Sequence, residues 1–103
     1  MSDDDSDENI AEIAIKFYFT AYSIYHNTNH PYLKAELLNQ VKEELSFHIS
    51  EFCLSLEDVQ EMIIHFFEHP PSKSDGNINL FVERSVFVRV GYSTGVISGY
   101  TEL

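Results

Sequence analysis

Residues 78–90 read INLFVERSVFVRV, and the fold class depends on how this stretch is interpreted. Its apolar residues recur at every second position, which is the period of a strand with one buried face. These positions are Ile78, Leu80, Val82, Val86, Val88 and Val90. One strand of this length would extend about 43 Å, at about 3.3 Å per residue, so we expect two strands broken near residues 83–85. The loop GYSTG (91–95) then leads to a third strand, VISGYT (96–101), which completes a small antiparallel sheet.

The chain before this stretch has helical periodicity instead. Apolar residues at spacings of three and four predict one helix over residues 10–25 and a second over 31–51, with Asn29 or His30 as the cap of the second. Ser55 and Asp58 have the spacing of a capping box and begin a third helix, which Pro70 and Pro71 end. The sequence therefore predicts an α+β fold, three helices followed by a small antiparallel β-sheet.

Length and composition predict a single domain over residues 9–103, preceded by an acidic segment, residues 1–8. That segment is acidic where a secretion signal needs basic residues, and the longest apolar region, residues 13–25, is too short to cross a bilayer. The one cysteine, Cys53, excludes a disulfide framework, and its apolar neighbours predict a small buried side chain. We therefore expect a cytoplasmic protein.

Charge is the strongest property of the whole chain. Seventeen acidic residues against six lysines and arginines give a net charge of −11. This balance argues against nucleic acid or an anionic membrane as a direct partner, and it favours a basic protein such as a nuclease or another nucleic-acid-binding protein. Residues 43–69 contain seven acids and no lysine or arginine. Within them, Glu57, Glu61 and Glu68 lie at spacings of four and seven, which places them on one face of the third helix.

The stretch HFFEH (65–69) matches the spacing of an inverted zinc-peptidase motif. Pro70 follows the second histidine directly, which puts that histidine at a helix end, and both phenylalanines are needed for packing. The chain also lacks a phosphate-binding glycine loop and a nucleophile motif. We therefore predict no enzyme activity, no catalytic residue, no metal site and no cofactor. For His26 and His30, which lie in a loop-like segment, we expect a capping or solvent-exposed role.

Two segments, AELLNQVKEEL (35–45) and SLEDVQEMIIHFFEHPPSKSD (55–75), resemble the colicin-type DNase immunity proteins. The residues that carry the resemblance are His65, Phe66, Glu68, His69, Pro70, Ser74 and Asp75. The resemblance implies an alternative, all-α four-helix fold that neutralises a basic nuclease. It also implies that the acids of residues 57–68, together with Asp75, contact that partner. The chain departs from the family at residues 76–81, where the family has a short helix with paired tyrosines, and in its first 34 residues.

The favoured function is a small, acidic, non-enzymatic inhibitor of a basic partner, either an immunity protein or a nucleic-acid mimic of the phage type. The predicted partner-binding residues are Glu57, Asp58, Glu61, Glu68 and Asp75. The alternative is a structural or adaptor subunit, such as a homodimer, that uses the aromatic first helix as its interface. That interface would consist of Phe17, Tyr18, Phe19, Tyr22 and Tyr25. The ending TEL (101–103) also fits a peptide ligand that adds a strand to a PDZ domain.

Overall fold

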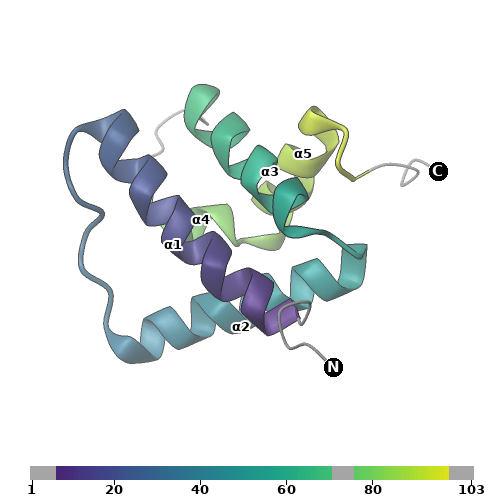
Figure 1. The fold of residues 1–103 in the computed structure, drawn as a ribbon, viewed down its shortest axis with the longest axis horizontal. Coiled ribbons are helices and arrows are strands. Elements are labelled where there is room, and N and C mark those ends of the chain that lie inside the picture. Colours follow the sequence, from purple (N-terminus) through teal and green to yellow (C-terminus); the bar gives the residue numbers. More distant parts are fainter. Residues whose placement is uncertain (1–6, 71–75, 98–103) are drawn as a thin grey trace.

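A computed structural model of the chain describes residues 7–70 and 76–97. It contains five helices and, within these ranges, no strand (Figure 1). The helices are α1 (Asp7–His26), α2 (Ala35–Phe52), α3 (Leu56–Glu68), α4 (Ile78–Phe81) and α5 (Arg84–Thr94). The predicted α+β fold is therefore wrong, and the all-α alternative fits the structure.

The error lies in residues 78–90, which form α4 and the first part of α5 instead of two strands. Phe81 and Phe87 interrupt the period-two pattern, yet both are completely buried. In α5 the buried positions are Phe87, Val90 and Gly91, which share one face of a helix. The high β propensity of the valines is a weak preference that packing overrides here. Gly95, at a φ of 82°, ends α5, and only residues 96 and 97 of the predicted third strand lie within the described chain.

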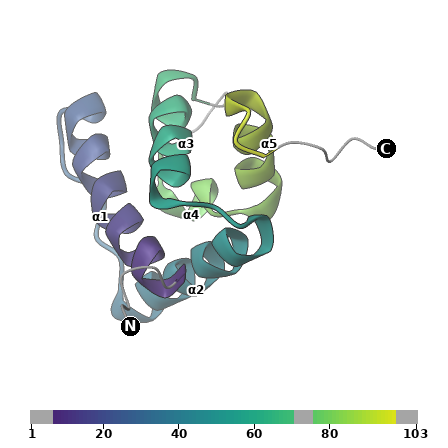
Figure 2. The same ribbon diagram turned by 45° about the vertical axis from the view of Figure 1, so that its right-hand side comes forward.

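The helices enclose one core, with α3 between α1 and α5 (Figures 1 and 2). Helix α1 packs against both α2 and α3, α5 packs against α3, and α4 contacts α5. Helix α2 crosses near the beginning of α1 (Figure 2). The first helix belongs to the core, because Tyr18 in its middle is fully buried.

A chain of aromatic rings joins the helices through the core. Phe81 of α4 lies 5.3 Å from the ring of Tyr18, 5.3 Å from Phe66 and 5.5 Å from Phe87. His48 of α2, only 1% exposed, stacks on Phe87 at 4.8 Å. Its Nε2–H donates a hydrogen bond of 2.8 Å to the carbonyl oxygen of Val82, between α4 and α5. This role of His48 was not predicted, because nothing in its spacing distinguishes a buried imidazole from an exposed one.

Helix α3 begins where the sequence predicts, whereas helix α2 does not. The Ser55 hydroxyl accepts from the Asp58 amide while the Asp58 carboxylate accepts from the Ser55 amide, so the predicted capping box is confirmed. Helix α2 begins four residues later than predicted, since Lys34 is still extended. His30 instead accepts a hydrogen bond of 3.0 Å from the amide of Ile78, at the start of α4. Cys53, predicted to be buried, is an exposed residue at a φ of 54°.

Candidate functional site

The exposed face of α3 carries a stripe of four residues at spacings of four, three and four. These are Glu57, Glu61, Ile64 and Glu68, and we call them the outer stripe of α3. The opposite face is buried in the core, where it contributes Val59, Met62, Ile63 and Phe66. The predicted alignment of Glu57, Glu61 and Glu68 on one exposed face is therefore confirmed.

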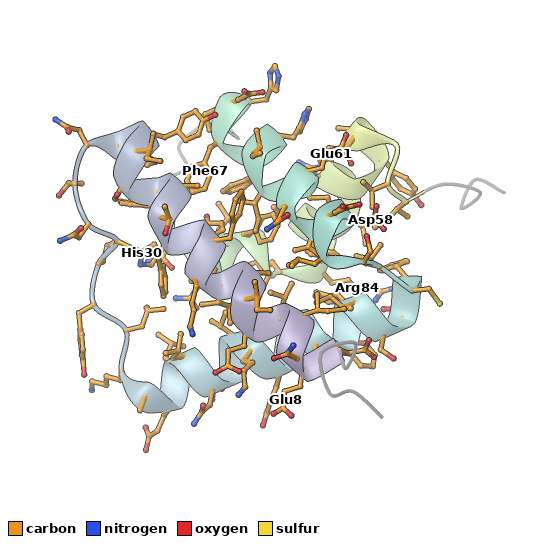
Figure 3. All side chains as sticks on the ribbon, viewed as in Figure 1. Glu8, His30, Asp58, Glu61, Phe67 and Arg84 are labelled. Atoms are coloured by element: carbon orange, nitrogen blue, oxygen red, sulfur yellow. The ribbon has the colours of Figure 1, made fainter. Side chains whose placement is uncertain are left out.

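None of these three glutamates forms a salt bridge with any residue of the described chain. Two of the chain's few cations are already engaged elsewhere. Lys42 Nζ lies 3.6 Å from a carboxylate oxygen of Glu8, and Arg84 donates to the Glu51 carboxylate through both terminal guanidinium nitrogens. Figure 3 shows Glu8 and Arg84 near α2, away from Glu61 on α3. The outer stripe thus presents to solvent three carboxylates that no cation of residues 7–70 or 76–97 pairs with.

The Glu51–Arg84 pair links the end of α2 to the start of α5. The hydrogen bond from Arg84 holds the pKa of the Glu51 carboxyl below its usual value. The Arg84 guanidinium also lies 5.6 Å from the ring centre of Phe52. This cation is therefore committed to the fold and is not available to neutralise the outer stripe.

Two of the predicted partner-binding residues lie apart from the stripe. Asp58 is half-buried and its carboxylate belongs to the capping box with Ser55, so its role in the structure is to begin α3. Asp75 lies outside the described residues. Ile64, 38% exposed, is an apolar member of the stripe that was not predicted. Helical spacing could have placed it there, because it stands three residues after Glu61.

Tyr25 extends the surface from α3 toward α1. Its ring stacks on Phe67 at 5.5 Å with an interplanar angle of 7°, and its hydroxyl donates to Glu68 over 3.4 Å. Partial desolvation raises the pKa of this hydroxyl, and the negative charge and hydrogen bond of Glu68 raise it further. Tyr25 is 46% exposed, so one edge of the outer stripe ends at an accessible aromatic ring.

The other aromatic residues of α1 are mostly committed to the core. Tyr18 and Tyr22 are buried, and Phe17 and Phe19 are half-buried and packed against the core. The Tyr18 hydroxyl donates a hydrogen bond of 2.5 Å to the carbonyl oxygen of Gly76. Of the five residues predicted as an oligomer interface, only Tyr25 is exposed.

The two histidines of HFFEH lie together at the end of α3. The ring centres of His65 and His69 are 4.6 Å apart, and the His69 amide donates to the His65 carbonyl oxygen as the helix ends. Phe66 and Phe67, between them, are buried as expected. Within the described chain, no group of three or more histidine, cysteine or acidic residues is arranged to hold a metal ion.

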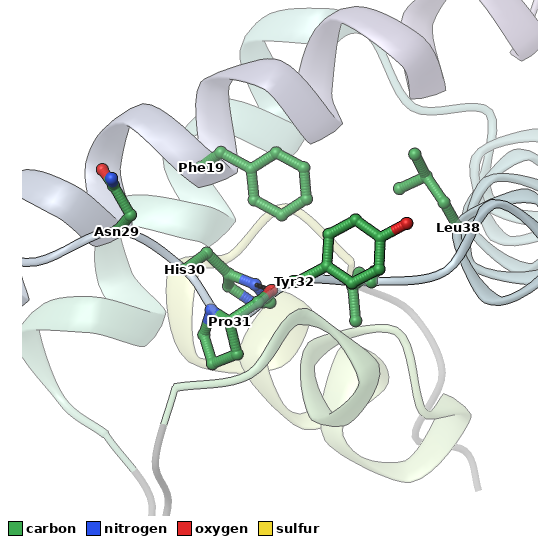
Figure 4. A pocket seen from close by; sticks show the side chains of 7 residues that line it. Phe19, Asn29, His30, Pro31, Tyr32 and Leu38 are labelled. Atoms are coloured by element: carbon green, nitrogen blue, oxygen red, sulfur yellow. Dashed lines mark hydrogen bonds between the residues drawn. The ribbon is translucent and has the colours of Figure 1, made fainter.

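A separate hollow of about 360 Å³ opens between α1 and the loop that precedes α2 (Figure 4). Phe19, His30, Tyr32 and Leu38 surround it. Both ring nitrogens of His30 are engaged, Nδ1 with the Pro31 carbonyl oxygen at 2.8 Å and Nε2 with the Ile78 amide. The imidazole therefore positions the loop against α4, and the remaining walls are largely apolar.

No helix in the described part of the chain combines the length and apolar character that a membrane span requires. Comparison of the chain with protein-family models, with curated proteins and with solved structures found no match in any of the three.

Proposed function

We propose that this chain is a non-enzymatic inhibitor that binds a basic protein through the outer stripe of α3. The observation that carries the proposal is the set of three exposed glutamates without a salt bridge to any described residue. Such a surface attracts lysine and arginine side chains and accelerates association with a basic partner. Ile64 and Tyr25 add exposed apolar area within and beside the acids, which a protein partner can bury.

The resemblance of residues 35–75 to the colicin-type DNase immunity proteins supports a nuclease as the partner. The family resemblance implies four helices; α2 and α3 lie within residues 35–75, and α4 and α5 follow that range. A short helix, α4, begins three residues after Asp75, although its sequence INLF lacks the paired tyrosines of the family. Helix α1 lies within the first 34 residues, where the chain departs from the family. A cytoplasmic location is part of the same proposal, because an inhibitor of an intracellular nuclease must meet it there.

The test begins with capture of a basic protein from the source cells on immobilised wild-type chain. Association rates of that protein are then measured at low and at high salt for the triple variant Glu57→Lys, Glu61→Lys, Glu68→Lys. Loss of electrostatic steering should slow association about 10- to 100-fold at low salt, and high salt should reduce the difference. If the captured protein is a nuclease, the same variant should lose inhibition.

A matched triple variant, Glu12→Lys, Glu36→Lys, Glu43→Lys, changes the net charge equally at exposed positions outside α3. It should retain most of the wild-type association rate. Equal rates for the two triple variants would show that only net charge matters, and an unchanged rate in the α3 variant would refute binding through the outer stripe.

A further inference from the structure

A second, smaller hollow lies between α3 and α5, where the last turn of α3 faces α5. It encloses about 120 Å³, and we call it the α3–α5 hollow. It is lined by His65, Phe66, His69, Val86, Arg89, Val90 and Ser93. It shares no residue with the outer stripe, so an inference about it does not depend on the proposed function.

Two helices supply complementary parts of this hollow. Phe66 and Val90 are buried and form an apolar floor. Arg89 and Ser93 stand one turn apart on α5 and are exposed, as is His69. The polar groups therefore gather around the opening while the floor excludes water from one side. A charge-assisted hydrogen bond is stronger against such a floor than in open solvent.

The charge of the α3–α5 hollow is opposite to that of the chain. The sequence has 17 acidic residues and only six lysines and arginines, yet no acidic residue lines the hollow. Arg89 forms no salt bridge with any residue of the described chain. Two of the five histidines, His65 and His69, also line the hollow, with ring centres 4.6 Å apart. The polar lining thus offers guanidinium, imidazole and hydroxyl donors, and no carboxylate of the described residues forms a salt bridge with Arg89.

We propose that the α3–α5 hollow binds an oxyanion of the carboxylate or phosphate class. The Arg89 guanidinium presents several N–H donors in a planar fork that matches the oxygens of either group. The Ser93 hydroxyl and the imidazoles of His65 and His69 complete the donor set. A metal cation fits this lining poorly, because only two imidazoles could ligate it and the guanidinium would repel it.

The experiment titrates the full chain with sodium phosphate and, separately, with sodium acetate, while chloride keeps the ionic strength constant. It is run at about pH 6, where a free imidazole carries a proton in most molecules. NMR signals of the histidine rings and of the arginine Nε–H groups report binding. Saturable shifts are expected at His65, His69 and Arg89, with His26 and His30 as internal controls. The two anions distinguish a tetrahedral oxyanion from a carboxylate as the preferred ligand.

Arg89→Gln should weaken the saturable response at His65 and His69 by at least about tenfold, because it removes the permanent charge. Lys34→Gln removes the same charge from an exposed position outside the hollow and should leave the response unchanged. His69→Gln, also at an exposed position, gives a second variant should Arg89→Gln fail to fold. The proposal is overturned if neither anion gives saturation, or if Arg89→Gln responds like the wild type.

Discussion

The two flanks of α3, one facing α1 and the other facing α5, differ in the side chains that they contact. On the α1 flank, Phe67 meets the rings of Tyr18, Tyr22 and Tyr25 at 4.8, 6.2 and 5.5 Å, a nearly continuous aromatic contact. On the α5 flank, the apolar contact gives way to a hollow rimmed by imidazoles and Arg89. One helix thus uses one flank for stability and leaves the other with room for polar chemistry, with its acids on the surface between them.

Phe66 contributes to both flanks, which makes it the residue whose loss should cost most. Its ring lies 6.3 Å from Tyr18 and 5.3 Å from Phe81, and it also forms part of the floor of the α3–α5 hollow. Phe66→Ala should lower the free energy of unfolding by about 3–5 kcal/mol, through lost burial and the cavity left behind. Urea unfolding monitored by circular dichroism measures the change.

Ile64→Ala is the matched control, since it truncates an apolar residue on the exposed side of the same helix. With 38% of Ile64 exposed, this change should cost clearly less than Phe66→Ala. Similar losses for the two variants would contradict the assignment of Phe66 to the shared core.

Gly91 tests how tightly the α5 flank is closed at its end. An alanine at a helix-interior glycine normally adds about 1 kcal/mol of stability. Here the new Cβ would overlap Ile97 Cδ1 and lie 3.0 Å from Ile97 Cβ, so the whole Ile97 side chain must move. Gly91→Ala should therefore destabilise the fold. Overpacking costs about 1–3 kcal/mol, and the better helix propensity of alanine offsets about 1 kcal/mol of that cost.

The cost of Gly91→Ala should fall when Ile97 is truncated. In an Ile97→Ala background, the contacts of the new Cβ with Ile97 Cδ1 and Cγ1 are gone and the one with Cβ remains at 3.0 Å, so Gly91→Ala should cost clearly less than in the wild-type chain. A double-mutant cycle of unfolding free energies gives this coupling. Additive effects in the cycle would show that Ile97 does not cover Gly91.

The sequence predicts α3 well because its signals are local. Ser55 and Asp58 contact each other within one turn, and Pro70 limits the helix regardless of the rest of the fold. The same is true of the outer stripe, since helical spacing alone aligns Glu57, Glu61 and Glu68.

Residues 78–90 could not be assigned in this way. Alternating valines have the local pattern of strands, and only contacts with distant rings show that Phe81 and Phe87 must both face the core. The α3–α5 hollow could not be predicted from the sequence either, because His65 and Arg89 come to line one hollow only through the packing of α3 against α5. Periodicity identifies the face of a helix, whereas the neighbour of that face is a property of the whole fold.

The smallest expected effect concerns Tyr25, where the α1 flank meets the outer stripe. The Glu68 carboxylate accepts the Tyr25 hydrogen bond and contributes to the raised pKa of the hydroxyl. Glu68→Gln should therefore lower the pKa of Tyr25, whereas Glu61→Gln removes an acid of the same stripe that makes no such bond and should shift it less. An NMR titration of the Tyr25 ring carbon that bears the hydroxyl measures both pKa shifts.

The same contact makes stability depend on pH. Because the pKa of Tyr25 is higher in the folded than in the unfolded chain, the stability that this hydroxyl contributes is lost as the pH rises through the pKa of the folded chain. Glu68→Gln should make the alkaline loss of stability shallower, and an unchanged pKa would place Tyr25 and Glu68 out of contact in solution.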